Sequence, residues 1–176
     1  RTNELVAIKV EPIEDNFKML KNEAIIYQHL LHSYGMPTLK WFGKDKHNYY
    51  LVITLLGKSL EHYIHQKGKF SIKLTLQIGV QVINLLKTIH DKGLIHRDIK
   101  PENFLLTCNQ KNIKLIDFGL AKYYMDENGN HRKLLQHNHI MGTPRYISIY
   151  VHERNDPSRR DDLISFVYTL LFLLGY

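Results

Sequence analysis

The sequence predicts an α+β fold in two lobes, a small β-rich lobe with one long helix followed by a mostly α-helical lobe. The first strand-like alternations of apolar and polar residues lie within residues 5–55. Long stretches with apolar residues at three- and four-residue spacing dominate from residue 60 onward. Gly57 interrupts the apolar pattern between the two parts. We therefore expect a hinge at residues 54–57.

The first lobe begins with a strand over residues 5–11, where side chains alternate and Pro12 ends the pattern. A helix is expected from residue 15 to about residue 32, because apolar residues recur there at helical spacing. Glu23 lies on the edge of that apolar stripe. A buried carboxylate is costly unless it is paired, so we expect Glu23 to pair with Lys9 of the strand. The alternative is a Glu23 that faces solvent.

Two more strands are expected over residues 38–42 and 49–55, joined by the polar turn 44–48. Residues 51–56 are nearly all apolar. Such a run is typical of a strand that is buried on both faces. We therefore expect both faces of this sheet to be covered.

The second lobe begins with two capped helices. Ser59 is expected to cap a short helix over residues 60–66, and Ser71 a longer one that ends at Gly93. The last fourteen residues, 163–176, form another apolar helical pattern. This run is shorter than the roughly 20 residues that span a bilayer. We expect a buried core helix and no membrane span.

A polar segment lies between two apolar elements in the middle of the chain. Residues 95–103 read Ile-His-Arg-Asp-Ile-Lys-Pro-Glu-Asn and are followed by a predicted hairpin, with strands at 104–106 and 112–116. The hairpin would hold Asn103 and Asp117 at neighbouring ends of one rigid unit. Their side chains carry the hard oxygen atoms that Mg²⁺ prefers.

These segments resemble the signature motifs of protein kinases, in the same order along the chain. They are residues 6–9 (Val-Ala-Ile-Lys), Glu23, the segment 95–103 and Asp-Phe-Gly at 117–119. Each residue alone would be read as an ordinary solvated or capping residue. The ordered set favours a kinase with a bilobal protein-kinase-like fold.

The resemblance implies a role for each of these side chains. Asp98 would accept the proton of the substrate hydroxyl, and Lys100 would reach toward the transferred phosphate. Asn103 and Asp117 would bind Mg²⁺, while Lys9, held by Glu23, would bind the phosphates of ATP. The implied cofactors are thus ATP and Mg²⁺.

Four segments resemble the casein kinase I family in particular. They lie at 96–106, 115–124, 142–148 and 158–163, and the last reads Ser-Arg-Arg-Asp-Asp-Leu. Most kinases carry Ala-Pro-Glu after the activation segment, which here would span about residues 120–141. The family has Ser-Ile-Asn instead, and this chain has Ser-Ile-Tyr at 148–150. The resemblance covers essentially the whole chain.

The family resemblance implies a division of the chain and a nucleotide pocket. Residues 1–176 would form one partial kinase domain, cut at both ends, with residues 1–53 in the first lobe, 54–57 as the hinge and 58–176 in the second lobe. The Gly-rich loop would lie before residue 1. Asp162 would tether the catalytic loop, which is the segment 95–103. The adenine would be contacted by Ala7, Ile53 as gatekeeper, the backbones of Thr54 and Leu56, and by Leu105 and Ile116.

The resemblance also bears on substrate choice. Arg145 matches one member of the basic cluster through which the family binds acidic or phosphorylated substrates. Asn138 stands where the family usually has lysine, and Pro144 and Tyr150 also depart from its pattern. We expect a weaker preference for acidic or primed sites than the family shows. Alternatively, Arg145 pairs with an internal acidic residue or a loop carbonyl.

Composition narrows the class of protein and its partners. The chain has 176 residues, is 44% hydrophobic and has a net charge of +7, which is typical of a globular domain with a basic bias. No dense Lys/Arg tract interleaved with aromatic residues indicates nucleic-acid binding. A single cysteine, Cys108, excludes an internal disulfide and fits a reducing compartment.

We therefore expect a Ser/Thr protein kinase that acts in the cytoplasm or nucleus on protein substrates, with no membrane or nucleic-acid partner. Two alternatives remain open. One is a pseudokinase or kinase-derived binding module, inactive as this piece of chain. The other is a small-molecule phosphotransferase, which the segments at 148–150 and 159–162 disfavour. The sequence does not indicate the oligomeric state.

Overall fold

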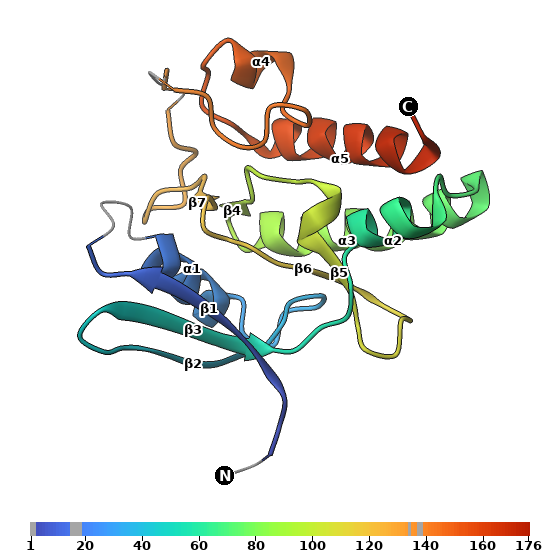
Figure 1. The fold of residues 1–176 in the computed structure, drawn as a ribbon. Helices are drawn as coiled ribbons and strands as arrows, with labels where there is room; N and C mark the ends of the chain where they lie inside the picture. The colour runs from blue at the N-terminus through green and yellow to red at the C-terminus, as the bar shows by residue number, and fades with distance from the viewer. Residues whose placement is uncertain (1–2, 15–18, 134, 137–138) are drawn as a thin grey trace.

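The computed structural model describes residues 3–14, 19–133, 135–136 and 139–176. Its first lobe is an antiparallel sheet of three strands in the order β1 (Val6–Pro12), β3 (Asn48–Thr54) and β2 (Leu39–Lys44). Helix α1 (Met19–His29) packs against this sheet (Figure 1). The predicted strands are thus confirmed, with ends that differ by one or two residues.

In the part of the chain that the structure describes, only one face of the sheet is covered, so the expectation for residues 51–56 was wrong. Leu51 points into the core and is fully buried. On the opposite face, Ile8 and Trp41 both lie beside Val52 and are 59% and 53% exposed. The reason is that α1 packs on one side of the strands, so side chains that alternate along β3 meet different environments.

Helix α1 ends at His29, about three residues earlier than expected, and its expected beginning at residues 15–18 lies outside the described residues. His32 has a φ of 63°, which is incompatible with a continuing helix. The carboxylate of Glu11 accepts hydrogen bonds from the backbone N–H groups of Met19 and Leu20, both at 3.0 Å. A negative charge next to the first N–H groups stabilises a helix N-terminus.

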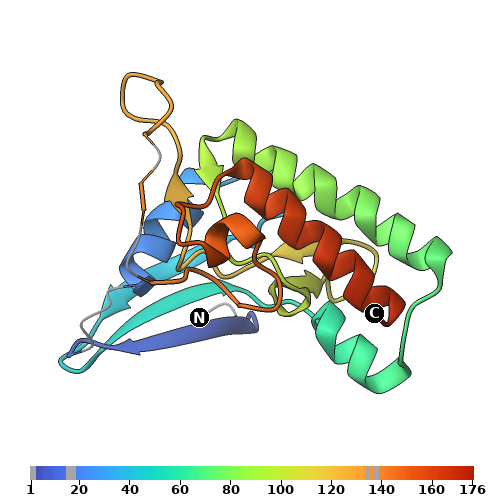
Figure 2. The same ribbon diagram turned by 90° about the horizontal axis from the view of Figure 1, so that it is seen from above.

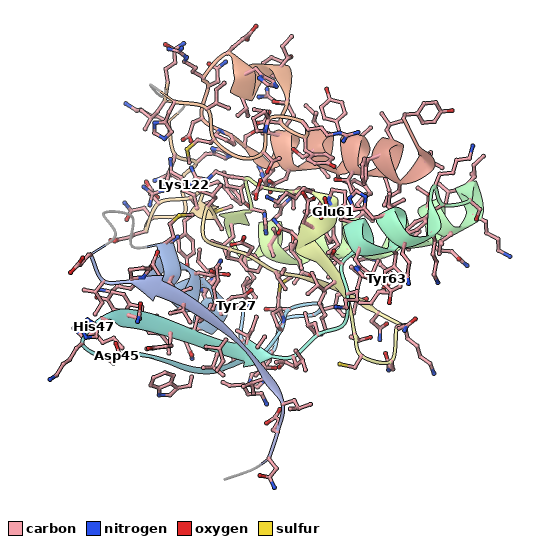
Figure 3. The ribbon with its side chains drawn as sticks, in the orientation of Figure 1. Tyr27, Asp45, His47, Glu61, Tyr63 and Lys122 are labelled. Atoms are coloured by element: carbon pink, nitrogen blue, oxygen red, sulfur yellow. The ribbon has the colours of Figure 1, made fainter. Side chains whose placement is uncertain are left out.

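The turn between β2 and β3 is built around Asp45 (Figure 3). Its carboxylate accepts hydrogen bonds from the backbone N–H groups of His47 at 2.7 Å and Asn48 at 2.8 Å, and from the hydroxyl of Tyr50 at 2.7 Å. These bonds, that of Tyr50 first, favour the ionised carboxylate and lower its pKa to about 2.

We expect the turn to lose this support in acid. Because the pKa of Asp45 is lower in the folded state, its contribution to stability is present above the ordinary pKa of about 4 and is lost as the pH falls toward 2. Carboxyl ¹³C shifts recorded during an NMR titration should give an apparent pKa near 2 for Asp45. An apparent pKa at the ordinary value would show that the three hydrogen bonds do not persist in solution.

The second lobe is built on three helices, α2 (Leu60–Lys67), α3 (Ile72–Asp91) and α5 (Arg159–Leu174). Figure 2 shows α3 and α5 running side by side. The hydroxyls of Ser59 and Ser71 cap α2 and α3 as predicted, accepting N–H bonds at 3.2 and 3.3 Å. The core between the helices and the hairpin consists of fully buried apolar side chains, among them Val82, Leu85, Leu86, Ile89, Phe104, Leu115 and Leu173.

The hairpin that follows the catalytic loop has the predicted form, β5 (Phe104–Leu106) paired with β6 (Ile113–Leu115). A short 3₁₀ helix, η1 (Pro101–Asn103), precedes it. Residues 55–58 connect the lobes without regular structure. The backbone N–H of Gly57 donates to the carbonyl of Leu106 at 2.8 Å, which joins this connection to the hairpin.

Besides η1, three short elements were not predicted. Strand β7 (Lys122–Tyr123) pairs with β4 (Leu94–Ile95), so a paired strand lies near the beginning of the predicted activation segment, residues 120–141. Helix α4 (Ile149–His152) is capped by Ser148. Elements of two to four residues carry too little periodicity to be recognised in a sequence.

Candidate active site

Three charged side chains from distant parts of the chain meet at Lys9. Its Nζ atom, at the end of a β1 side chain, lies 2.8 Å from Oε2 of Glu23 and 2.8 Å from Oδ1 of Asp117. The pairing of Lys9 with Glu23 was predicted and is confirmed. The contact with Asp117, which is 108 residues away, was not predicted.

Helix α1 holds the segment around Asp117 in place. The side chain of Glu23, 2% exposed, also accepts the backbone N–H of Phe118 through Oε1 at 3.2 Å. The backbone N–H of Asp117 donates to the hydroxyl of Tyr27 at 3.3 Å. The ring of Phe118 is fully buried and packs edge-on against Tyr27, with ring centres 5.2 Å apart. A shift of α1 would therefore move Asp117.

Burial and charge act in opposite directions on these three groups. Burial raises the pKa of Glu23, and the charge of Lys9 opposes it. Burial alone would raise the pKa of Asp117, but the hydrogen bond and charge of Lys9 outweigh it and hold that pKa below its usual value. Burial likewise disfavours the charged form of Lys9, yet the two carboxylates raise its pKa. Lys9 is thus a cation and Asp117 an anion near neutral pH.

A small cavity of about 230 Å³ opens beside this triad. Three of the predicted adenine contacts, Ala7, Ile53 and Ile116, line it. The other lining residues are Ile8, Lys9, Glu23, Tyr27, Leu51 and Asp117.

The remaining predicted adenine contacts do not line this cavity. Thr54 ends β3, where its backbone N–H donates to the carbonyl of Thr38 at 3.0 Å. Leu56 follows in the connection between the lobes, and its backbone N–H has no hydrogen-bond partner in the described part of the chain. Leu105 lies on β5 and is half-buried.

The carboxylate of Asp98 contacts three neighbours, of which Asn103 donates through Nδ2 to Oδ2 at 3.4 Å. Its Oδ1 accepts hydrogen bonds from Thr143, from the backbone N–H at 3.0 Å and from the hydroxyl at 2.7 Å. Its Oδ2 lies 2.8 Å from Nζ of Lys100, which also donates to the hydroxyl of Thr143 at 2.9 Å. Asp98, Lys100 and Thr143 thus form a closed triangle.

Thr143 was not predicted as a site residue. The segment 142–148 carries the family resemblance but gives Thr143 no role of its own. Gly142 has a φ of 88°, and a Cβ at this position would lie 2.5 Å from the carbonyl oxygen of Arg97. Glycine at 142 is therefore what allows the chain to approach the catalytic loop and place Thr143 on Asp98.

Asn103 lies beside Asp98 and is buried. Its Nδ2 donates to the backbone carbonyl of Asp98 at 2.8 Å, and its Oδ1 accepts no hydrogen bond from any residue that the structure describes. The carbonyl of Asn103 accepts the backbone N–H of Ile116 at 3.0 Å, one residue before Asp117. The hairpin thus holds Asn103 and Asp117 at neighbouring ends, as expected.

Asp162, near the start of α5, anchors the catalytic loop as the resemblance implied. Its two carboxylate oxygens accept the backbone N–H groups of His96 and Arg97, both at 2.9 Å. Burial lowers the pKa of His96 although Asp162 opposes the shift. A neutral imidazole suits its surroundings, because Nε2–H can donate to the carbonyl of Ile116 at 3.0 Å while Nδ1 accepts the N–H of Asp98 at 3.3 Å.

A second, unpredicted anchor joins the catalytic loop to the segment after Asp117. The carboxylate of Asp156 lies 3.8 Å from Nη1 of Arg97 and 2.8 Å from Nζ of Lys122. Figure 3 shows Lys122 in this part of the second lobe. Asp156 therefore holds two basic residues that flank the site.

Arg145 lies on the surface, away from the triad at Lys9. Its guanidinium is stacked over the ring of Phe172, 4.7 Å from the ring centre. It makes no ion pair with any residue in the described ranges. Asn138, the position at which lysine was expected, lies outside the described residues.

The two lobes and the residues between them define the class of the protein. Residues 1–174 match the family model described as "Protein kinase domain", and the chain belongs to this family. Within it the chain is casein kinase I-like. It is 38% identical over 178 aligned residues to casein kinase I homolog 2 of Schizosaccharomyces pombe (strain 972 / ATCC 24843). The predicted family and fold class are thereby confirmed.

The aligned region covers 98% of this chain but 41% of the yeast protein. The chain thus spans less than half the length of that relative. Among the described residues, no helix combines the length and the apolar character that crossing a membrane requires.

Proposed function

We propose that the protein transfers the γ-phosphate of ATP to serine or threonine residues of proteins, as a casein kinase I-type enzyme. The observation that carries the proposal is the position of Lys9, 2.8 Å from both Glu23 and Asp117. A cation for the phosphates thus lies directly beside a carboxylate that can bind a metal ion.

Asp98 would accept the proton of the substrate hydroxyl. A general base must be held within hydrogen-bond reach of that proton, and the two bonds from Thr143 restrict the carboxylate to one orientation. The ammonium of Lys100, 2.8 Å from Asp98, would place a positive charge beside the negatively charged phosphoryl group during its transfer.

Asn103 and Asp117 would hold Mg²⁺. The donor set fits this ion, because Oδ1 of Asn103 has no partner among the described residues and the side chain of Asp117 is 40% exposed. When bound, Mg²⁺ neutralises charge on the phosphates. In the same cavity, Ala7, Ile53 and Ile116 offer apolar walls suited to adenine.

Leu105 and the backbones of Thr54 and Leu56 would complete the adenine site. The backbone N–H of Leu56, which has no partner among the described residues, supports this role, since it can donate to an acceptor on the base. The proposed site therefore uses residues of both lobes and of the connection between them.

One experiment separates this function from its alternatives. The protein is incubated with Mg²⁺ and γ-labelled ATP, with a mixture of peptides carrying serine, threonine or tyrosine acceptors, and with a small alcohol such as choline. We expect the label on serine and threonine peptides. Label on the alcohol alone would support a small-molecule phosphotransferase, whereas nucleotide binding without any transfer would support a pseudokinase or binding module.

We expect Arg145 to read acidic or phosphorylated residues on the N-terminal side of the target serine. Arg145 is an exposed residue, and a guanidinium can bind a phosphate or carboxylate with two parallel hydrogen bonds. Such a contact is worth about 1.5–3 kcal/mol, or roughly a tenfold to hundredfold preference. A peptide array compares the wild type with Arg145→Ala, which should lose the preference for acidic sites.

Two controls accompany this array. Arg145→Lys keeps the charge but not the paired geometry and should retain only part of the preference. Arg132→Ala removes an arginine that donates to the carbonyl of Met125 and should change nothing. An Arg145→Ala enzyme that keeps its full acidic preference would show that another group reads the substrate.

We further propose an intracellular setting, in the cytoplasm or nucleus, with proteins as the partners that are modified. The proposal rests on the single cysteine, Cys108, and on its exposure as a free thiol. A tagged copy seen by microscopy in a secretory compartment would contradict it.

A further inference from the structure

A groove lies in the helical lobe, apart from the cavity beside Lys9 and from the residues around Asp98. Its volume is about 640 Å³, and it runs between α2, α3 and the β5–β6 hairpin. We propose that this groove docks a short segment of a partner protein that combines apolar side chains with aspartate or glutamate. The lining residues are Leu60, Tyr63, Lys67, Phe70, Leu74, Gln77, Ile78, Val80, Gln81, Leu106, Gln110, Lys111 and Ile113.

The groove has an apolar floor and an apolar rim. Leu60, Ile78 and Ile113 are buried at its base. Leu74 and Val80 stand on the rim, and Val80 is 63% exposed. Solvent-exposed apolar side chains around a cavity of this size are typical of a binding site.

The charge of this region is one-sided. Lys67 and Lys111 line the groove, and none of its lining residues is acidic. The sequence contains no aspartate or glutamate from residue 62 to 90 or from 103 to 116, whereas Lys69 and Lys73 add positive charge nearby. An unbalanced basic rim favours an acidic partner.

The nearest carboxylate on α2 belongs to Glu61, which is not among the lining residues. It lies 3.7 Å from the imidazole of His65, one turn along the same helix. Figure 3 shows Glu61 and Tyr63 on different sides of α2. Glu61 therefore does not neutralise the charge of the lysines that line the groove.

Three glutamine side chains supply groups that match a peptide backbone. Gln81 is already oriented, because its Oε1 accepts the backbone N–H of Ile113 at 3.0 Å, and its amide nitrogen has no partner among the described residues. Gln77 and Gln110 have no side-chain hydrogen bond within the described residues. Amide side chains both donate and accept, so they can pair with the N–H and C=O groups of an extended segment.

The groove is separate from the site of phosphate transfer. Leu106 and Ile113 lie at one end of the paired strands of the hairpin, and Asn103 and Asp117 flank the other end. A segment bound in the groove would hold a partner protein on the enzyme without touching the reacting groups. The inference thus goes beyond the proposed function and can be tested by binding alone.

The test is a panning experiment with a display library of short random peptides against the wild-type protein. Recovered sequences should combine apolar residues with aspartate or glutamate. Their affinities are then measured by fluorescence anisotropy. For Lys67→Glu/Lys111→Glu we expect a loss of about tenfold or more, since each lost contact between charged groups is worth about 1.5–3 kcal/mol. Lys46→Glu, in the β2–β3 turn, should bind as the wild type does.

A second pair of variants tests the apolar rim on one helix. Val80→Glu places a carboxylate in the groove and should weaken binding, whereas Leu76→Glu changes a side chain of matching exposure, 62%, that does not line it. Both variants should phosphorylate a peptide without a docking segment at the wild-type rate. The proposal is overturned if no recovered peptide depends on Lys67 or Lys111, if Leu76→Glu weakens binding as much as Val80→Glu, or if basic peptides bind equally well.

Discussion

Replacing Asp98 by asparagine is expected to lower phosphate transfer by about 10²- to 10⁴-fold, the usual contribution of a general base. An asparagine oxygen can still accept both hydrogen bonds from Thr143, so the loop should keep its shape. The amide nitrogen would face Lys100, which can keep its bond to the hydroxyl of Thr143. The fold and the affinity for Mg-ATP should therefore be preserved while turnover is lost.

The matched control for this variant is Asp126→Asn. Asp126 accepts backbone N–H bonds from Asn128 and Asn130 in an exposed turn, and its carboxylate lies outside the site. Transfer to a serine peptide and calorimetric titration with Mg-ATP are measured on both variants. Undiminished transfer by Asp98→Asn would remove Asp98 from the role of base.

The second large effect is expected for Lys9→Met, which should weaken Mg-ATP binding roughly tenfold to hundredfold. A hydrogen bond to a charged group is worth about 1.5–3 kcal/mol, and Lys9 lines the cavity together with Asp117, 2.8 Å from its carboxylate. The separate variant Asp117→Ala should also weaken Mg-ATP binding, because it removes a metal ligand.

Lys9→Met should also destabilise the fold, because Glu23 would remain buried without its cation. Breaking a fully buried pair costs about 3–5 kcal/mol. The cost here should be smaller, since the Lys9 side chain is 49% exposed and its charge is partly screened by solvent. The double variant Lys9→Met/Glu23→Gln should recover part of this stability without recovering nucleotide affinity.

Calorimetry and thermal unfolding of the same preparations separate the two effects. Lys46→Met, a change of the same type in the β2–β3 turn, serves as the control. If Lys9→Met and Asp117→Ala both bind Mg-ATP as tightly as the wild type, the nucleotide site lies elsewhere.

Local patterns were enough to predict most regular elements. The caps at Ser59 and Ser71 and the hairpin after Asn103 depend on neighbouring residues, and they were found as expected. The pairing of Lys9 with Glu23 was also predictable, because an acidic residue on an apolar helical stripe needs a partner.

The missed contacts of the site all join distant segments of the chain. Nothing near Thr143 in the sequence indicates that it bonds Asp98, 45 residues earlier. The anchor from Asp156 to Arg97 and Lys122 likewise depends on how the chain returns to the loop. Burial of the sheet was misjudged because an apolar run shows that a strand can be covered, not which of its faces is covered.

The central claim is that the residues around Lys9 and Asp98 form a working phosphotransfer site. A single-turnover measurement tests it most directly, with the protein and a serine peptide in excess over γ-labelled Mg-ATP and the peptide analysed after rapid quenching. The account predicts that each bound ATP gives one phosphoserine, at a rate that falls about 10²- to 10⁴-fold in Asp98→Asn. Labelled ATP that stays intact on the protein, with binding confirmed by calorimetry, would contradict it.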